Sequence, residues 1–291
     1  MSEKFEAIKS ISHAFDGFKR KFWPIVGWVA LPWLILIPVV LLIGFTIVGS
    51  LLGGLVGLEY AVETGNFNGL FLSGGFIATL VIFYLFFLLF GSWHGIYSAR
   101  LGTQVLLGED MRPSDARQRG FNRMASFLLV SVVVIAGYAV VGFAAVVAIK
   151  FLSDLGGLGI FLAIAVGIAF VVAMVYVGLG LGPIMFIMAN EGLGFFALGR
   201  SWQLVSGNRW QLLGNMFLWM LIFAGIHLIY FLCVFTAGML MTVSVALGLL
   251  LIFLIGTIFF CVMIALGTVV GPSIYLGLLK VEGLKAESSY A

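Results

Sequence analysis

The chain has 291 residues, of which 63% are hydrophobic and 9% charged, with a net charge of +3. A soluble domain carries roughly 25% charged residues, so this composition excludes one. Residues 210–279 contain no Asp, Glu, Lys or Arg. As one helix this run would be about 105 Å long, against a hydrocarbon core of roughly 30 Å, so it must fold back on itself. We predict an all-α integral membrane protein, because backbone amides in lipid must be satisfied within the segment.

The N-terminal arm predicts an amphipathic helix that lies in the headgroup layer. Its apolar residues recur every three or four positions, which places them on one helical face. They are Phe5, Ile8, Ile11, Phe15, Phe18 and Phe22. Polar residues, Ser10 and His13 among them, occupy the other face. This pattern is typical of an interfacial helix.

Six transmembrane helices are predicted in a single membrane domain, residues 1–291. They cover approximately 24–50, 72–98, 124–149, 157–188, 211–234 and 240–278. The connection from Gly53 to Gly69 reads as an outer loop, and a turn is expected near Phe235–Gly238, where Gly and Thr interrupt the aliphatic pattern. Every Lys and Arg except Lys150 lies on one side of these spans, so the positive-inside rule places both termini in the cytoplasm. We therefore expect a bacterial cytoplasmic (inner) membrane protein.

Three segments of the chain resemble one another, which predicts three repeats of an interfacial helix and a helical hairpin. The approximate units are 1–109, 110–192 and 193–285. The even-numbered spans end in the related sequences GSWHGIYS, GLGLGPIMF and GTVVGPSIY. Their shared residues are predicted to serve helix packing or kinking: Gly91, Gly95, Gly178, Gly182, Pro183, Gly267, Gly271 and Pro272. Close packing through glycine is favoured over a transporter-like binding site at the paired Gly-Pro sequences.

The stretch ALGRSWQLVSGNRWQLLG, residues 197–214, concentrates Arg and Trp in an otherwise apolar chain. Phe195, Leu198, Trp202 and Val205 predict one apolar stripe on a short interfacial helix. Trp at the membrane boundary and Arg toward lipid phosphates indicate anchors, and a specific ligand site is the alternative reading. The predicted anchors along the chain are Phe15, Lys19, Arg20, Lys21, Trp23, Arg123, Arg200, Trp202, Arg209 and Trp210.

This stretch, preceded by NEGLGFF, resembles the signature of the membrane domain attached to some bacterial glycerophosphoryl diester phosphodiesterases, which related polytopic membrane proteins share. The resemblance is specific over roughly Pro183 to Phe217 and diffuse elsewhere. It implies a membrane module. The catalytic barrel of those phosphodiesterases has no counterpart in this sequence, so the resemblance does not imply their activity.

The predicted spans contain no Asp, Glu, Lys or Arg, so they offer no embedded carboxylate for ion coupling. His227 in the fifth span is the one polar group that stands out, and an interhelical hydrogen bond is its expected use. We expect no catalytic residues, no metal site and no cofactor.

The sequence favours a non-enzymatic membrane protein: a scaffold, an accessory or assembly subunit, or a lipid-organising factor. The alternative is a lipid or small-solute transporter or channel that uses the Gly-Pro kinks of the fourth and sixth spans. A membrane enzyme is a more distant third. The expected partners are membrane lipids and another membrane protein or complex; nucleic acid is not expected.

Overall fold

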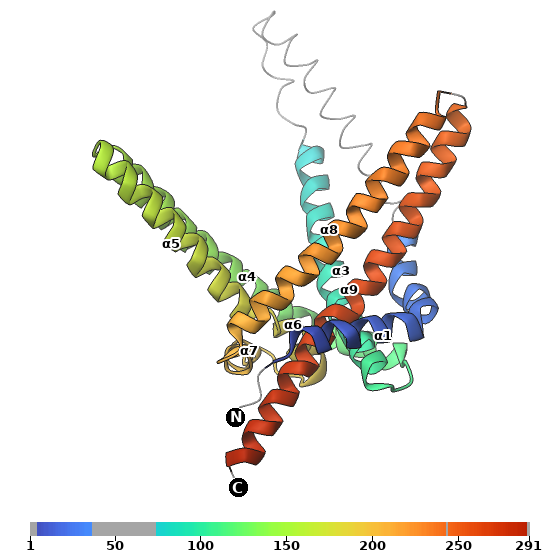
Figure 1. Ribbon diagram of the computed structural model, residues 1–291, viewed down its shortest axis with the longest axis horizontal. Coiled ribbons are helices and arrows are strands. Elements are labelled where there is room, and N and C mark those ends of the chain that lie inside the picture. The colour runs from blue at the N-terminus through green and yellow to red at the C-terminus, as the bar shows by residue number, and fades with distance from the viewer. Residues whose placement is uncertain (1–4, 37–73, 243, 290–291) are drawn as a thin grey trace, which may run out of the picture.

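The computed structural model describes residues 5–36, 74–242 and 244–289, and every regular element within these ranges is a helix (Figure 1). This agrees with the predicted all-α class. In chain order the helices are α1 (Ala7–Ile25), the π-helix η1 (Val26–Ala30), α3 (Gly74–Leu107), α4 (Pro113–Ser153), α5 (Gly157–Leu181), α6 (Ile184–Asn190), α7 (Ala197–Val205), α8 (Arg209–Leu240) and α9 (Val245–Ser289).

Five segments of the described chain are long and apolar enough to cross a membrane. They are Val81–Leu107, Pro113–Ser153, Gly157–Asn190, Arg209–Leu240 and Val245–Gly283. These correspond to the second to sixth predicted spans. The first predicted span, 24–50, is described only as far as residue 36, and the predicted outer loop, 53–69, lies outside the described residues.

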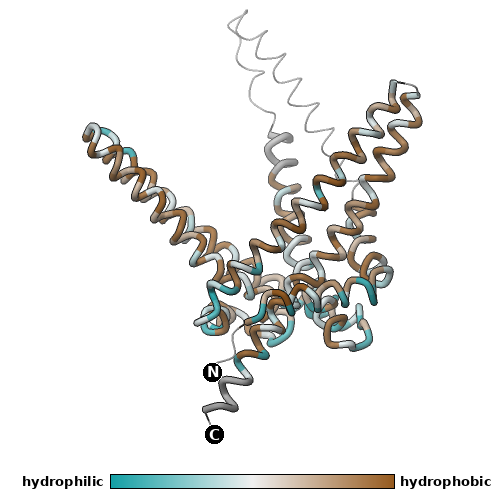
Figure 2. Tube along the Cα trace, viewed as in Figure 1, coloured by the Kyte–Doolittle hydropathy of each residue, from teal (hydrophilic) through white to brown (hydrophobic). Residues whose placement is uncertain are grey.

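The longest helices exceed the predicted spans. α4 has 41 residues and α9 has 45, which correspond to about 60 and 70 Å, roughly twice the hydrocarbon thickness of a bilayer. Figure 2 shows hydrophobic residues along most of these helices and hydrophilic residues near their ends. Each helix therefore continues from an apolar layer into polar surroundings.

Two buried apolar clusters hold the helices together in a region that we call the base. It consists of α1, α6, α7, the C-terminal halves of α3 and α9, and the first turns of α4 and α8 (Figure 1). One cluster gathers residues of α4 to α9 around Ile187 and Leu278, and the other gathers residues of α1, η1, α3, α4, α8 and α9 around Leu101 and Val269. α4, α8 and α9 contribute to both clusters, and α9 also packs against α1, η1, α3 and α8, which makes it the central helix of the base.

Two helical hairpins, α4–α5 and α8–α9, extend from the base as arms, and α3 extends between them. The arms diverge, so that their tips lie far apart at opposite sides of Figure 1. Within each hairpin the two helices pack along one another. Most of the apolar side chains on the arms are nonetheless exposed, Phe143, Phe161 and Phe231 among them.

The turn of the second arm lies further along the chain than predicted. α8 continues through Phe235 and Gly238 to Leu240, and α9 begins at Val245. A single Gly does not end an apolar helix in lipid, because the backbone has no alternative hydrogen-bonding partner there. The prediction near Phe235–Gly238 is wrong by about one helical turn.

The three predicted interfacial helices differ from one another. α1 has a kink at Lys21 and runs directly into η1, whereas α7 is a separate helix that ends before Ser206. In the middle segment, Ser114 to Asn122 forms the beginning of α4, so no separate helix precedes the span.

The apolar stripe expected on α1 is also only partly correct. Ile8 is exposed, whereas Ser10, Ala14 and Gly17 are buried. The reason is that α1 packs between other helices of the base, and small residues permit that close approach. Within α7 the stripe is likewise broken: Phe195 precedes the helix and is exposed, and Val205 is buried.

The two Gly-Pro sequences have different effects. Gly182 and Pro183 separate α5 from α6, whereas Pro272 lies inside α9, which continues through it. Only the first of the two predicted interruptions therefore breaks a helix.

Among the predicted packing glycines, Gly95 and Gly271 make closer contacts than Gly91 and Gly267, which lie one helical turn before them. A Cβ at Gly95 would lie 2.9 Å from Met185 Sδ, and a Cβ at Gly271 would overlap the Phe186 ring. α6 is thus held between α3 and α9 at two corresponding glycines. By contrast, a Cβ at Gly91 or Gly267 would meet nothing within 4 Å, and those at Gly178 and Gly182 would make ordinary contacts.

Candidate functional site

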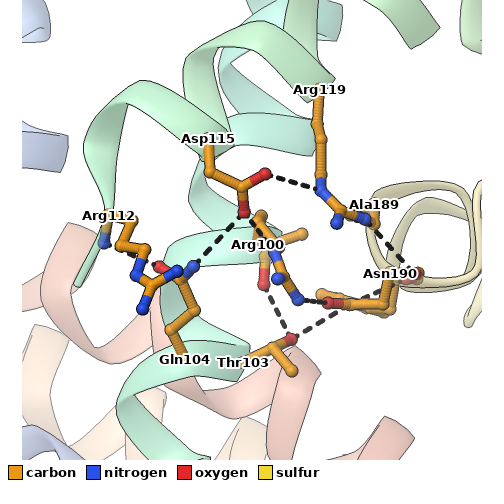
Figure 3. Close-up of polar contacts among 10 residues, drawn as sticks. Arg100, Thr103, Gln104, Arg112, Asp115, Arg119, Ala189 and Asn190 are labelled. Atoms are coloured by element: carbon orange, nitrogen blue, oxygen red, sulfur yellow. Dashed lines mark hydrogen bonds and ion pairs between the residues drawn. The ribbon is translucent and has the colours of Figure 1, made fainter. Parts of the chain in front are cut away.

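Asp115, in the first turn of α4, binds two arginines (Figure 3). Its carboxylate accepts hydrogen bonds from Arg100 Nε on α3 and from Arg119 Nε on α4, both at 3.0 Å. The Gln104 amide adds a longer hydrogen bond of 3.4 Å. A carboxylate at a helix N-terminus also interacts favourably with the helix dipole. Asp115 therefore fixes the beginning of α4 against the end of α3.

Asn190, the last residue of α6, joins the same network. Arg100 Nη1 donates to Asn190 Oδ1 at 3.0 Å, and the Asn190 amide donates to Thr103 Oγ1 at 3.1 Å. Arg119 Nη1 donates to the carbonyl oxygens of Ala189 and Asn190 at 3.3 and 3.4 Å. The last carbonyls of a helix lack partners within it, so Arg119 acts as the C-terminal cap of α6.

A cavity of about 630 Å³ borders this network. Its lining residues are Arg100, Gln104, Gly108, Glu109, Asp110, Arg112, Asp115 and Arg119. Three arginines and three acidic residues balance in charge, so the lining has no marked preference for anions or cations. The geometry is that of a clamp between three helix ends.

Arg200 on α7 forms a second clamp. Its Nε donates to Glu191 at 3.0 Å, its Nη2 donates to Glu282 at 2.7 Å, and Tyr275 Oη donates to Glu191 at 2.8 Å. Hydrogen bonding to Glu282 is the largest cause of the raised pKa of Arg200, and Glu191 adds to it. Arg200 was expected to reach lipid phosphates, but here it ties α7 to the end of α6 and to α9.

Arg209, the first residue of α8, lies between two aromatic rings. Its guanidinium carbon is 3.8 Å from the centre of the Tyr176 ring and 4.0 Å from that of Trp202. Its Nε is buried and has no hydrogen-bond partner among the described residues. Trp202 also covers Gly180, where a Cβ would overlap the indole. This stack joins α5, α7 and α8, so Trp202 and Arg209 serve packing within the base.

Other predicted anchors divide into exposed and packed groups. Trp23 and Trp210 are 77% and 81% exposed, as expected of residues that face a membrane boundary. Phe15 stacks on Trp219, and Arg20 donates to the Val105 carbonyl at 2.6 Å, so both tie α1 to neighbouring helices.

The three remaining anchors lie at the edge of the base. Lys19 is exposed, whereas Lys21 is half-buried at the kink of α1. Arg123 approaches Gly192, which has a positive φ of 71° and follows α6.

The two described histidines within apolar helices bond to carbonyl groups. His227 Nδ1 lies 2.7 Å from the Phe223 carbonyl of the same helix, so the expected interhelical hydrogen bond is not the one observed. His94 accepts from the Trp33 indole at 3.2 Å through Nδ1, and its Nε2 lies 3.0 Å from the Val29 carbonyl.

The Gly-Pro break borders a small apolar cavity of about 160 Å³ between α5, α8 and α9. Gly178, Gly182, Pro183, Gly271 and Tyr275 line it, together with apolar side chains. The structure thus brings both predicted Gly-Pro regions to one place.

Sequence reasoning finds Glu191 and Glu282 at corresponding places after two of the repeats but assigns no role to them, to Asp115 or to the amide of Asn190. The signal was available in part, because the chain has only 12 acidic residues. Glu191 and Glu282 follow the predicted fourth and sixth spans within four residues, and Asp115 lies in the polar segment before the third. A carboxylate in such a place needs a cation near it, but sequence alone does not identify which one.

Comparison of the chain with protein-family models, with curated proteins and with solved structures finds no match.

Proposed function

We propose that this protein is a non-enzymatic membrane scaffold. In this proposal the base holds helical hairpins at fixed angles, and the diverging arms leave room for lipid or for another membrane protein between them. The supporting observation is the contrast between the tightly clamped base and the exposed arms (Figure 1). A carrier that closes around a solute would need its helices to pack against one another along the membrane.

The proposal includes six spans, of which the first lies mostly outside the described residues, and the threefold repeat. It places the base and both termini in the cytoplasm of a bacterium, on the positive-inside argument. The base carries Arg100, Arg112, Arg117, Arg119 and Arg200, whereas Lys150 lies near an arm tip. The kinship with the membrane domain of the phosphodiesterases is part of the same proposal.

Transport is the second candidate, and the cavity at the Gly-Pro break is the observation that favours it. The cavity lies between the predicted second and third repeats and includes Tyr275, which suits a pathway at a repeat interface. However, its volume of about 160 Å³ is below the roughly 300 to 1,000 Å³ of small-molecule sites. Its lining is also almost entirely apolar, so the scaffold is the stronger proposal.

The test is purification at natural abundance in lipid-preserving polymer discs, followed by mass spectrometry of the proteins and lipids that copurify. A scaffold predicts a membrane protein present in fixed ratio or a lipid class enriched above bulk membrane. The purified chain is also reconstituted into liposomes loaded with small solutes. Solute flux that requires the protein would instead establish transport.

A further inference from the structure

We propose that the pocket between the N-terminal segment and the beginning of α4 binds the phosphate and one acyl chain of an anionic phospholipid. The inference deepens the scaffold proposal, since it rests on the placement of the base at a membrane surface. The cavity measures about 510 Å³, which is the size of a small-molecule site. Residues 27–35, α3 and the first turns of α4 supply its walls.

One end of this pocket is cationic. Arg117 and Ser114 line it, and Arg117 is exposed. Arg117 has no hydrogen bond or ion pair within the part of the chain that the structure describes. The nearby Asp115 does not neutralise it, because the Asp115 carboxylate is held by Arg100 and Arg119 (Figure 3).

The position of Ser114 strengthens the preference for a negative charge. Ser114 lies in the first turn of α4, and the N-cap residue, Arg112, makes no side-chain hydrogen bond there. The N-terminus of a helix carries a partial positive charge and unpaired N–H groups. A phosphate at this end would therefore meet the Arg117 guanidinium and the Ser114 hydroxyl, at a helix N-terminus whose dipole it would share with Asp115.

The other walls are apolar and aromatic. Trp28, Leu31, Ile35 and Tyr97 contribute to them, and the first three remain more than half exposed. Trp28, Leu31 and Ile35 lie along the beginning of the predicted first span, 24–50, where it leaves the base. An acyl chain laid along this flank would cover Leu31 and Ile35, while its headgroup stayed beside Arg117.

The position of the pocket along the membrane normal also suits a lipid headgroup. Arg117 lies seven residues before the predicted beginning of the third span at residue 124, which is about 10 Å along a helix. The headgroup layer extends roughly 5 to 8 Å beyond the hydrocarbon core, and a long Arg side chain covers the difference. Trp23 and Trp28, both exposed, mark the same boundary.

The assignment to an anionic lipid follows from the charges that line the pocket. No acidic side chain is among its lining residues in the described structure. The ammonium of a zwitterionic headgroup would therefore lack a carboxylate partner, whereas the glycerol of phosphatidylglycerol needs none. A free phosphate would leave the apolar walls uncovered.

The experiment is a native mass spectrometry titration of the delipidated full chain in detergent, with phosphatidylglycerol and phosphatidylcholine that have identical acyl chains. We expect tighter binding of phosphatidylglycerol, and we expect Arg117→Gln to weaken it by roughly tenfold, the effect of one charge-assisted hydrogen bond. Arg112→Gln removes the same charge five residues away, outside this pocket, and should retain the wild-type affinity.

A second variant tests the apolar part of the pocket. A Cβ at Gly27 would meet nothing within 4 Å, so Gly27→Leu should fill the cavity without disturbing the fold, and binding should fall. Equal losses in the Arg117 and Arg112 variants would overturn the site in favour of diffuse charge. If phosphatidylcholine bound as tightly as phosphatidylglycerol, the assignment to an anionic lipid would be wrong. If glycerol phosphate competed for the pocket as strongly as phosphatidylglycerol does, the pocket would be a phosphate site and the acyl chain would play no part. None of these outcomes affects the search for a protein partner or for solute flux, so the two proposals fail separately.

Discussion

Arg209 shows how a residue that resembles a lipid anchor in sequence can serve packing in the fold. Its guanidinium carbon lies 3.8 Å from the centre of the Tyr176 ring and 4.0 Å from that of Trp202, and the two rings meet edge to face, so one cation contacts both of them. We expect Arg209→Lys to lower the free energy of unfolding by about 1–2 kcal/mol, because a lysine ammonium keeps the charge but is too compact to keep contact with both rings. The measurement is the unfolding midpoint in detergent.

Arg112→Lys is the matched control for this substitution. Arg112 has an exposed side chain, and its guanidinium has no ion pair within the described ranges, so the shorter side chain should leave the midpoint unchanged. An unchanged midpoint for Arg209→Lys as well would show that the aromatic stack does not contribute to stability.

For single residues, the sequence predicted exposure at the membrane boundary better than it predicted which residues contact one another. Trp23 and Trp210 are exposed as a boundary location requires, because each depends only on its own helix. Arg200 and His227 have partners other than the expected ones. Glu191 and Glu282 are 9 and 82 residues away from Arg200, and only the fold brings them together.

Helix α3 crosses α9 closely at Gly102, which sequence reasoning did not single out. A Cβ at Gly102 would overlap the Thr268 carbonyl oxygen and would lie 2.9 Å from the Pro272 ring. Because the obstacle is backbone, a side-chain rotation cannot relieve it. We expect Gly102→Ala to lower the free energy of unfolding by about 1–3 kcal/mol, measured as the midpoint in the same detergent.

Gly91→Ala provides the comparison within the same helix. Nothing lies within 4 Å of a Cβ at Gly91, so this change should be neutral or should stabilise α3 by up to about 1 kcal/mol. If Gly102→Ala and Gly91→Ala unfolded at the same midpoint, α3 and α9 would be further apart at Gly102 than they are in the structure.

Helix existence and order were predictable for this chain, and helix ends were less so. The apolar runs identified α4, α5, α8 and α9, since length and hydropathy alone decide whether a segment can span a membrane. The turn after α8 and the fusion of residues 114–122 with α4 were not predicted. Both depend on how far a helix continues once it leaves the apolar layer, and neighbouring helices decide that.

The divergence of the arms has a physical explanation in the placement of small residues. Lipid tails are as apolar as leucine, so helices associate in a membrane only where small residues allow close packing. In the base, Gly95, Gly102 and Gly271 face other helices directly. In the arms, a Cβ at Gly137 or Gly225 would meet nothing within 4 Å. The glycines that allow helices to pack closely therefore lie in the base, and Gly137 and Gly225 give the arms no such contact with each other.

This arrangement predicts a large distance between the arm tips in a bilayer. Spin labels at positions 154 and 242, in a variant whose Cys233 and Cys261 are replaced by Ala, report that distance by pulsed electron paramagnetic resonance in lipid nanodiscs. Figure 1 shows the two arm tips at opposite sides of the molecule. We expect a mean far above the roughly 10 Å between packed helices.

Labels at positions 150 and 158, on the two helices of one arm, provide the short reference distance, because α4 and α5 pack along one another. If the tip-to-tip distance fell into the same short range, the arms would close into a single bundle in lipid. The room between them would then be lost, and the scaffold proposal would lose the observation that supports it. A long distance that shortens when a copurifying membrane protein is removed would instead show that the partner holds the arms apart, with the base acting as their hinge.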